Sequence, residues 1–248
     1  MSLQSRAVTM TKQMIQIEST DPGTYENAMA DWITTQLAPY PNVRLSRQEV
    51  LPGRPNLIAE LTGDPSLPAL VMICHMDTVV VGDGWTLPPF DAIEKDGKIY
   101  GRGACDMKSG LACCLSAFQY AAETLQTSGK TPKQTLKLIC SMDEEDFMRG
   151  SEACIQAGWV TDHDWVIDAE PTNGQIQMAH KGRTWYEIDV QGHTAHASTP
   201  WKGADAIAAM AEIIREIRHA ILYAPVHPDM GSSTVTFGQI TGGYRPYV

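Results

Sequence analysis

The chain has 248 residues, of which 43% are hydrophobic, so it holds enough apolar side chains for a substantial core. Its formal net charge of −10 argues against nucleic-acid binding, because a phosphate-binding surface needs a basic stripe that this sequence lacks. No apolar run approaches the ~20 residues of a membrane span, and residues 1–11 lack the charged and apolar regions of a signal peptide. We therefore expect a cytoplasmic protein with no membrane partner and no nucleic-acid partner.

The first part of the chain alternates between helix and strand patterns. Apolar residues recur at helical spacing over residues 8–17, 25–37 and 108–125. Short apolar runs predict four strands, at residues 56–61, 69–74, 134–140 and 165–167. This alternation of helices and strands predicts a layered α/β domain.

The pattern changes after Asn173. Two strand-like segments, residues 184–190 and 233–239, flank a long helix that an apolar stripe predicts over residues 204–223. These three elements form the pattern of a small α+β unit. The sequence therefore predicts two domains, residues 1–179 and residues 180–248.

Residues that can bind a divalent metal follow successive strand-like runs. They are His75, Asp77, Asp106, Glu144, Glu145 and Glu170. In open α/β sheets, ligands gather beyond the carboxyl ends of the strands, which is where most of these residues are expected. Imidazole and carboxylate donors without thiolate suit zinc, cobalt or manganese. The series predicts a two-metal hydrolytic site.

Each donor has a role that its chemistry allows. His75 can offer one ring nitrogen to a metal ion while Asp77, two residues on, holds the other ring nitrogen. Asp106 has two carboxylate oxygens and can bridge two ions. Neighbouring side chains such as those of Glu144 and Glu145 point in different directions, so one can ligate metal while the other acts as a base.

Each of these features alone has a simpler explanation. A single histidine near a strand end is most often structural, and paired glutamates most often form a solvated surface. An aspartate between glycines is usually a turn residue. Residues 101–109 also contain glycines and a Lys-Ser pair, but Met107 stands where a phosphate-binding loop needs glycine. The order of the donors along the chain is what favours a metal site.

Five segments of the chain match the motifs of a known family. They are Cys74-His75-Met76-Asp77-Thr78-Val79, Tyr100-Gly101-Arg102-Gly103-Ala104-Cys105-Asp106-Met107-Lys108-Ser109-Gly110, Asp143-Glu144-Glu145, Glu170-Pro171-Thr172 and Gly192-His193-Thr194-Ala195-His196-Ala197. Through these motifs the sequence resembles the M20 metallopeptidases, and especially their deacetylase and desuccinylase branch. The resemblance implies a layered α/β zinc-hydrolase catalytic domain with an inserted α+β lid, or dimerisation, domain, both incomplete in this chain.

The resemblance also implies a ligand set for two zinc ions. His75 and Glu170 are the implied ligands of one zinc, Asp106 bridges the two ions, and Glu145 binds the second. The family's second zinc takes another histidine close to the C-terminus. That histidine lies beyond the end of this chain, so we expect the chain to be truncated inside the lid domain.

The remaining implied roles concern catalysis. Glu144 is the implied general base and Asp77 the partner of His75. His196 corresponds to the residue that reaches from one subunit's lid into its partner's active site, which implies a homo-oligomer. The implied reaction is hydrolysis of the amide bond of an N-acyl amino acid or short peptide. A catalytically inactive fragment that binds metal or forms oligomers is the alternative.

Overall fold

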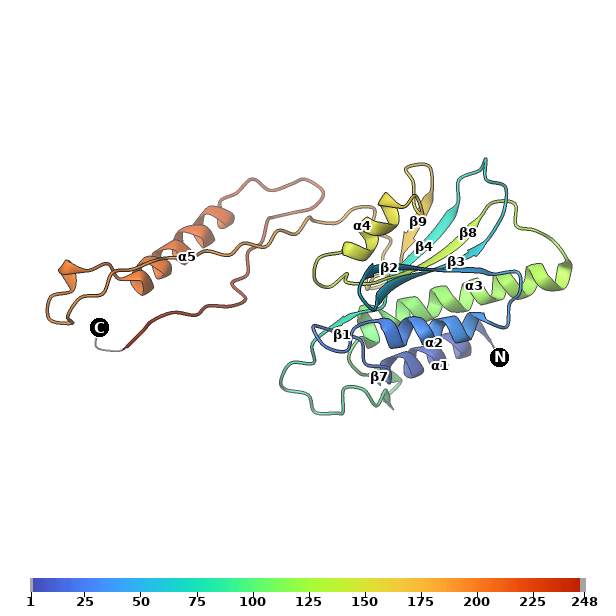
Figure 1. Cartoon of the computed structure of the whole chain (residues 1–248), viewed down its shortest axis with the longest axis horizontal. Helices are drawn as coiled ribbons and strands as arrows, with labels where there is room; N and C mark the ends of the chain where they lie inside the picture. The colour runs from blue at the N-terminus through green and yellow to red at the C-terminus, as the bar shows by residue number, and fades with distance from the viewer. Residues whose placement is uncertain (1, 246–248) are drawn as a thin grey trace. The chain divides into compact units, whose positions relative to one another are not determined.

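The computed structural model describes residues 2–245, which form two compact units. One unit ends at Gly174 and the other begins at Gln175, whereas the sequence prediction placed its domain boundary at residue 180. Figure 1 labels most of the helices and strands. In chain order the elements are α1 (Leu3–Ile15), β1 (Thr20–Asp21), α2 (Asn27–Leu37), β2 (Arg44–Leu51), β3 (Arg54–Leu61), β4 (Leu70–His75), β5 (Thr78–Val79), β6 (Ile93–Lys95), β7 (Lys98–Tyr100), η1 (Ala104–Lys108), α3 (Ser109–Ser128), β8 (Leu136–Ser141), α4 (Arg149–Gln156), β9 (Trp165–Asp168), η2 (Pro200–Lys202) and α5 (Ala206–Leu222).

The first unit is built on a five-stranded sheet in the order β2-β3-β8-β4-β9. β3 pairs antiparallel with both β2 and β8, whereas β4 runs parallel to β8 and β9. In register, Ile73 on β4 lies opposite Ile139 on β8 and Asp168 on β9. The carboxyl ends of β4, β8 and β9 therefore meet at the same edge of the sheet.

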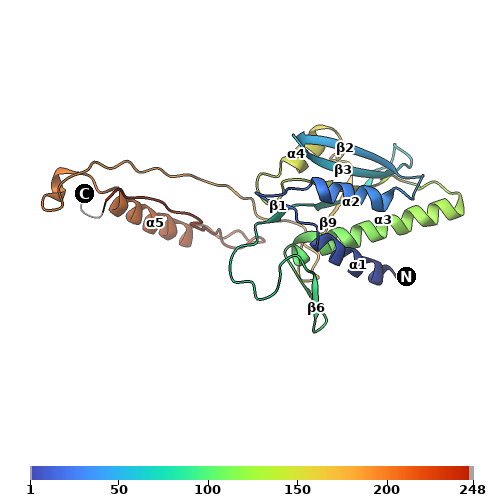
Figure 2. The same cartoon turned by 60° about the horizontal axis from the view of Figure 1, so that its bottom comes forward.

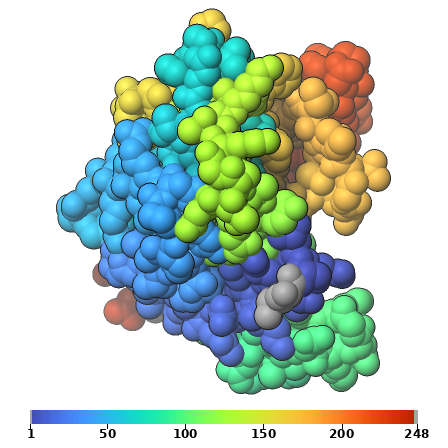
Figure 3. All heavy atoms as spheres, turned by 90° about the vertical axis from the view of Figure 1, so that its right-hand side faces the viewer, coloured from blue at the N-terminus to red at the C-terminus, as the bar shows by residue number. Residues whose placement is uncertain are grey.

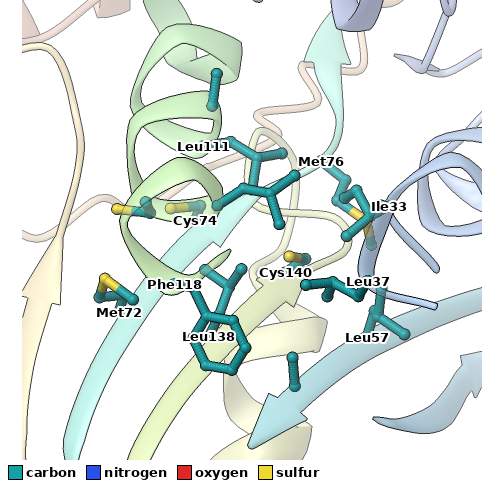
Figure 4. Close-up of a cluster of buried hydrophobic side chains, with 14 of the residues drawn as sticks. Ile33, Leu37, Leu57, Met72, Cys74, Met76, Leu111, Phe118, Leu138 and Cys140 are labelled. Atoms are coloured by element: carbon teal, nitrogen blue, oxygen red, sulfur yellow. The ribbon is translucent and has the colours of Figure 1, made fainter. Parts of the chain in front are cut away.

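Helices cover both faces of this sheet. Helices α1, α2 and α3 lie on one face and α4 lies on the other (Figures 1 and 2). The main core lies between the sheet and the three helices, where Leu57, Phe118 and Leu138 are fully buried (Figure 4). Because side chains alternate along a strand, Ile139 points to the opposite face and packs with Cys154 of α4. The predicted α/β layered architecture is confirmed.

Most predicted elements of this unit form close to their expected positions. The predicted helices correspond to α1, α2 and α3, and the predicted strands to β3, β4, β8 and β9. The sequence prediction omitted β2 and α4. It also omitted the hairpin of β6 and β7, which projects from the unit (Figures 2 and 3).

The second unit has one long helix, α5, which matches the helix predicted over residues 204–223. The strands predicted at residues 184–190 and 233–239 are wrong, because residues 175–245 contain no strand. Alternating apolar residues give a segment the side-chain pattern of a strand, but a strand also needs a hydrogen-bonded neighbour. These two segments remain largely exposed. Among the described residues, no helix has the length and apolar character needed to cross a membrane.

Candidate metal centre

The predicted metal donors of the first unit come from four separate segments. His75 is the last residue of β4, and Glu170 follows β9 by two residues. Glu144 and Glu145 lie in the turn between β8 and α4. Because β4, β8 and β9 are parallel neighbours, their ends deliver these side chains to one edge of the sheet.

The fourth segment is η1, which carries Asp106 to the same edge. Gly103 at its start has a φ of +78°, a backbone conformation that favours glycine. A Cβ atom there would lie 2.6 Å from Cγ2 of Thr78, so a side chain would also push the segment away. Beyond Asp106, Met107 is buried and its Sδ lies 3.0 Å from the backbone nitrogen of His75. This packing fixes Asp106 beside the end of β4.

The donor atoms converge on the Nε2 atom of His75. Carboxylate oxygens lie at 3.0 Å (Asp106), 3.5 Å (Glu170) and 3.9 Å (Glu144) from it. Ligand atoms of one tetrahedral zinc ion, with bonds of ~2.0–2.2 Å, are separated by roughly 3.4 Å. The separations between the carboxylate oxygens and Nε2 of His75, 3.0–3.9 Å, lie on both sides of this value.

Two overlapping groups of donors that include His75 are close enough to hold an ion. One is His75 with Asp106 and Glu145, and the other is His75 with Glu144 and Glu170. In each group, one ligand atom per residue lies within 4.8 Å of the others. Both glutamates of the pair are therefore within reach of a metal, so their division into ligand and base stays a prediction.

The other ring nitrogen of His75 determines how the ring can bind. Its Nδ1 lies 2.9 Å from the backbone carbonyl oxygen of Asp77 and 3.5 Å from a carboxylate oxygen of the same residue. A carbonyl oxygen only accepts, so Nδ1 carries the hydrogen and donates it. In the neutral ring Nε2 then presents its lone pair to the carboxylate cluster, as a metal ligand must.

The Asp77 carboxylate makes contacts that the sequence did not predict. It is buried and accepts hydrogen bonds from the backbone N–H groups of Glu144, at 3.1 Å, and Glu145, at 3.0 Å. Asp77 therefore links the end of β4 to the turn that carries the glutamate pair. Its predicted role as the partner of His75 stays a prediction.

The electrostatics of the cluster favour a cation. Burial opposes a charged imidazole, but hydrogen bonds with Asp106 and Asp77 outweigh it and raise the pKa of His75 to about 11. Burial, together with the nearby Asp106 charge, raises the pKa of Glu170 to about 8. Protons on His75 and Glu170 thus partly neutralise the negative charge of the neighbouring carboxylates. A divalent ion can replace these protons, and imidazole with carboxylates is a donor set that zinc accepts.

His196 lies in the second unit and is exposed. Its Nδ1 lies 2.9 Å from the hydroxyl oxygen of Ser198. Its predicted reach into a partner's active site stays a prediction.

A buried charged network lies behind the glutamate pair and was not predicted from the sequence. Arg54 on β3 binds Glu26 and Asp21, and Asp143 is held by Arg149. The available signal was weak: Arg54 lies two residues before the strand predicted at residues 56–61, and it begins the observed strand, in which every residue is buried.

The chain is similar in sequence to proteins of one peptidase family. The model of peptidase family M20/M25/M40 matches residues 71–242. A probable succinyl-diaminopimelate desuccinylase of Staphylococcus aureus strain Mu50 is 36% identical over 167 residues, covering 66% of this chain and 40% of that protein. Acetylornithine deacetylase of Buchnera aphidicola subsp. Schizaphis graminum is 34% identical over 175 residues, covering 68% of this chain and 44% of that protein.

A solved structure has the same fold. Aminopeptidase PepT from Bacillus cereus aligns with a TM-score of 0.59 at 22% identity, covering 98% of this chain and 63% of that chain. The matched region is 40–44% of the length of the two curated relatives named above. Because the family model covers most of the sequence, the chain belongs to peptidase family M20/M25/M40.

Proposed function

We propose that this protein is a zinc-dependent hydrolase that cleaves the amide bond of an N-acyl amino acid or short peptide. One observation carries the proposal: three carboxylate oxygens converge within 3.0–3.9 Å of the Nε2 atom of His75, at the edge where three parallel strands end. Members of this family are metal-dependent, generally with zinc. The donor set supports the same metal here, with cobalt or manganese as chemically acceptable substitutes.

The complete site would hold two zinc ions. His75 and Glu170 would bind one ion, Glu145 would bind the other, and Asp106 would bridge them. When bound, zinc supplies Lewis acidity, which polarises the acyl carbonyl and makes water acidic enough to react near neutral pH. The 52% exposure of the Asp106 side chain leaves this position accessible to solvent and substrate.

Glu144 is the proposed general base. Its carboxylate would take a proton from the attacking water and return a proton to the leaving amine, so that the amide bond breaks to a carboxylate and an amine. The 28% exposure of its side chain allows contact with both water and substrate. Asp77 would keep Glu144 in place through the hydrogen bond to its backbone N–H. In a partner subunit, His196 would help to stabilise the oxyanion.

The substrate class follows from the relatives. One is named a probable succinyl-diaminopimelate desuccinylase and another an acetylornithine deacetylase. A panel of N-succinyl amino acids, N-acetyl amino acids and dipeptides would therefore test the range. The proposed assembly is a homo-oligomer. The cytoplasmic location stays a prediction.

The direct test compares two histidine variants of the full chain in the presence of zinc. His75→Ala should lose both bound zinc and hydrolysis of the panel. His163→Ala is a matched control, because His163 lies in the same unit with 85% of its side chain exposed, and it should keep both. If wild-type chain binds zinc at His75 but hydrolyses nothing in the panel, the non-catalytic fragment replaces the enzyme proposal. If His75→Ala keeps its zinc, the proposed site is wrong.

A further inference from the structure

The turn that carries the glutamate pair is held by its backbone as well as by its side chains. Three successive N–H groups, those of Asp143, Glu144 and Glu145, all donate to buried carboxylates. Asp77 accepts the last two, whereas the first donates to Oε1 of Glu26 at 3.1 Å. Glu26 is fully buried and directly precedes α2. Two carboxylates from distant parts of the chain therefore fix one turn.

The backbone of this turn needs such support. Asp143 has a φ of +62°, in the left-handed region that only a few non-glycine residues adopt. A residue in this region costs on the order of 1–3 kcal/mol and persists only where its surroundings hold it. The Asp143 side chain is fully buried and accepts two hydrogen bonds of 2.6 Å from Arg149, and its N–H is held by Glu26.

Arg54 holds Glu26 in position to accept that N–H group. Its Nε donates to Oε2 of Glu26 at 2.9 Å, and one Nη atom donates to Oε1. The same guanidinium contacts Asp21 at 2.5 Å and lies 4.2 Å from the centre of the Tyr25 ring. Paired, buried charges of this kind have little freedom to move.

We propose that Glu26, held by Arg54, is a positioning residue for hydrolysis: it fixes the Asp143 peptide and so sets where the Glu144 carboxylate lies. The inference rests on the proposed function, in which Glu144 is the base. A displacement of a reacting group by about 1 Å can cost ~10²-fold in rate. The effect of Glu26 on turnover is therefore expected to exceed its effect on substrate binding.

Removing the Glu26 carboxylate should leave the chain folded. Without it, the positive charges of Arg54 and Arg149 still face the negative charges of Asp21 and Asp143. The network then contains two positive and two negative side chains, so its charges balance. Glu60 supplies a matched control, because it is also a buried carboxylate paired with an arginine, Arg44, at 2.7 Å, and it lies on the same strand as Arg54.

The first measurement is steady-state kinetics on the zinc-loaded full chain. Glu26→Ala should lower kcat by ~10²-fold with little change in KM. Glu26→Gln should recover most of the lost kcat, because its amide oxygen can still accept the Asp143 N–H. Glu60→Ala should lower the melting temperature and leave kcat unchanged. The inference is overturned if Glu26→Ala keeps wild-type kcat, or if Glu26→Gln is as impaired as Glu26→Ala.

The second measurement is amide hydrogen exchange, which needs no turnover. In Glu26→Ala, exchange should accelerate at Glu144 and Glu145 as well as at Asp143, although their own acceptor, Asp77, is unchanged. Acceleration confined to Asp143 would overturn the positioning role. If the wild-type chain hydrolyses no substrate, the proposed function fails, and exchange alone still decides whether Glu26 fixes the turn.

Discussion

Replacing Asp77 by alanine should destabilise the zinc-free chain by about 2–6 kcal/mol. The Asp77 side chain is fully buried and accepts two backbone N–H groups at 3.0 and 3.1 Å. Each of these N–H groups lies in a partly buried turn and costs up to ~1–3 kcal/mol when it loses its acceptor. Asparagine keeps one acceptor oxygen, so Asp77→Asn should cost about half as much, ~1–3 kcal/mol. Against total stabilities of ~5–15 kcal/mol, the asparagine variant should stay folded throughout this range, and the alanine variant wherever the total exceeds its loss.

Urea unfolding of the zinc-free chain measures these losses without a contribution from metal release. Asp64→Ala is the matched control, because Asp64 also accepts a backbone N–H, from Ser66 at 2.9 Å, but at an exposed position. That variant should unfold at nearly the wild-type urea concentration. An Asp77→Ala chain that is no less stable than Asp64→Ala would refute the view that Asp77 holds the turn.

Three further predictions concern the base, the response to pH and the assembly. Glu144→Gln should lower turnover by at least ~10²-fold with zinc content unchanged, whereas Glu145→Gln should lower zinc content; equal loss of zinc in both variants would contradict the division of roles. The pKa of Glu170 is raised from 4.5 to about 8. The stability that its protonated form contributes is therefore fully present below a pH of 4.5 and is lost as the pH rises through about 8. The melting temperature of the zinc-free chain should therefore fall between about pH 5 and 8, and Glu170→Gln should remove this contribution; the same fall in that variant would count against it. Light scattering should show an oligomer, because apolar side chains such as Ile207 and Leu222 are exposed on α5; a monomer at high protein concentration would contradict this.

The central strands were predictable because burial on both faces leaves continuous apolar runs. β4 is such a run, and β8 has a buried apolar run after Lys137; both formed close to where the sequence placed them. β2 lacks this signal, since it is an edge strand of largely polar residues that are partly exposed. α4 has only eight residues, of which Gly150 and Cys154 are buried, so its apolar pattern is too short to recognise.

The candidate site was predictable in its residue types and less so in its contacts. Donors that follow strands converge wherever those strands are parallel neighbours, and this follows from topology. The contact between the Asp77 carboxylate and the backbone of the glutamate pair joins residues 67 and 68 positions apart. The contact between Glu26 and Asp143 spans 117 positions. No local pattern predicts such pairs, because they depend on how the sheet and helices pack.

The most direct test of the metal centre is X-ray diffraction at the zinc absorption edge from crystals of the chain grown with zinc. We expect an anomalous peak ~2.0–2.2 Å from Nε2 of His75 and from carboxylate oxygens of Asp106 and Glu170. Zinc bound only at other residues, with the His75 ring still facing carboxylates and no ion, would contradict it.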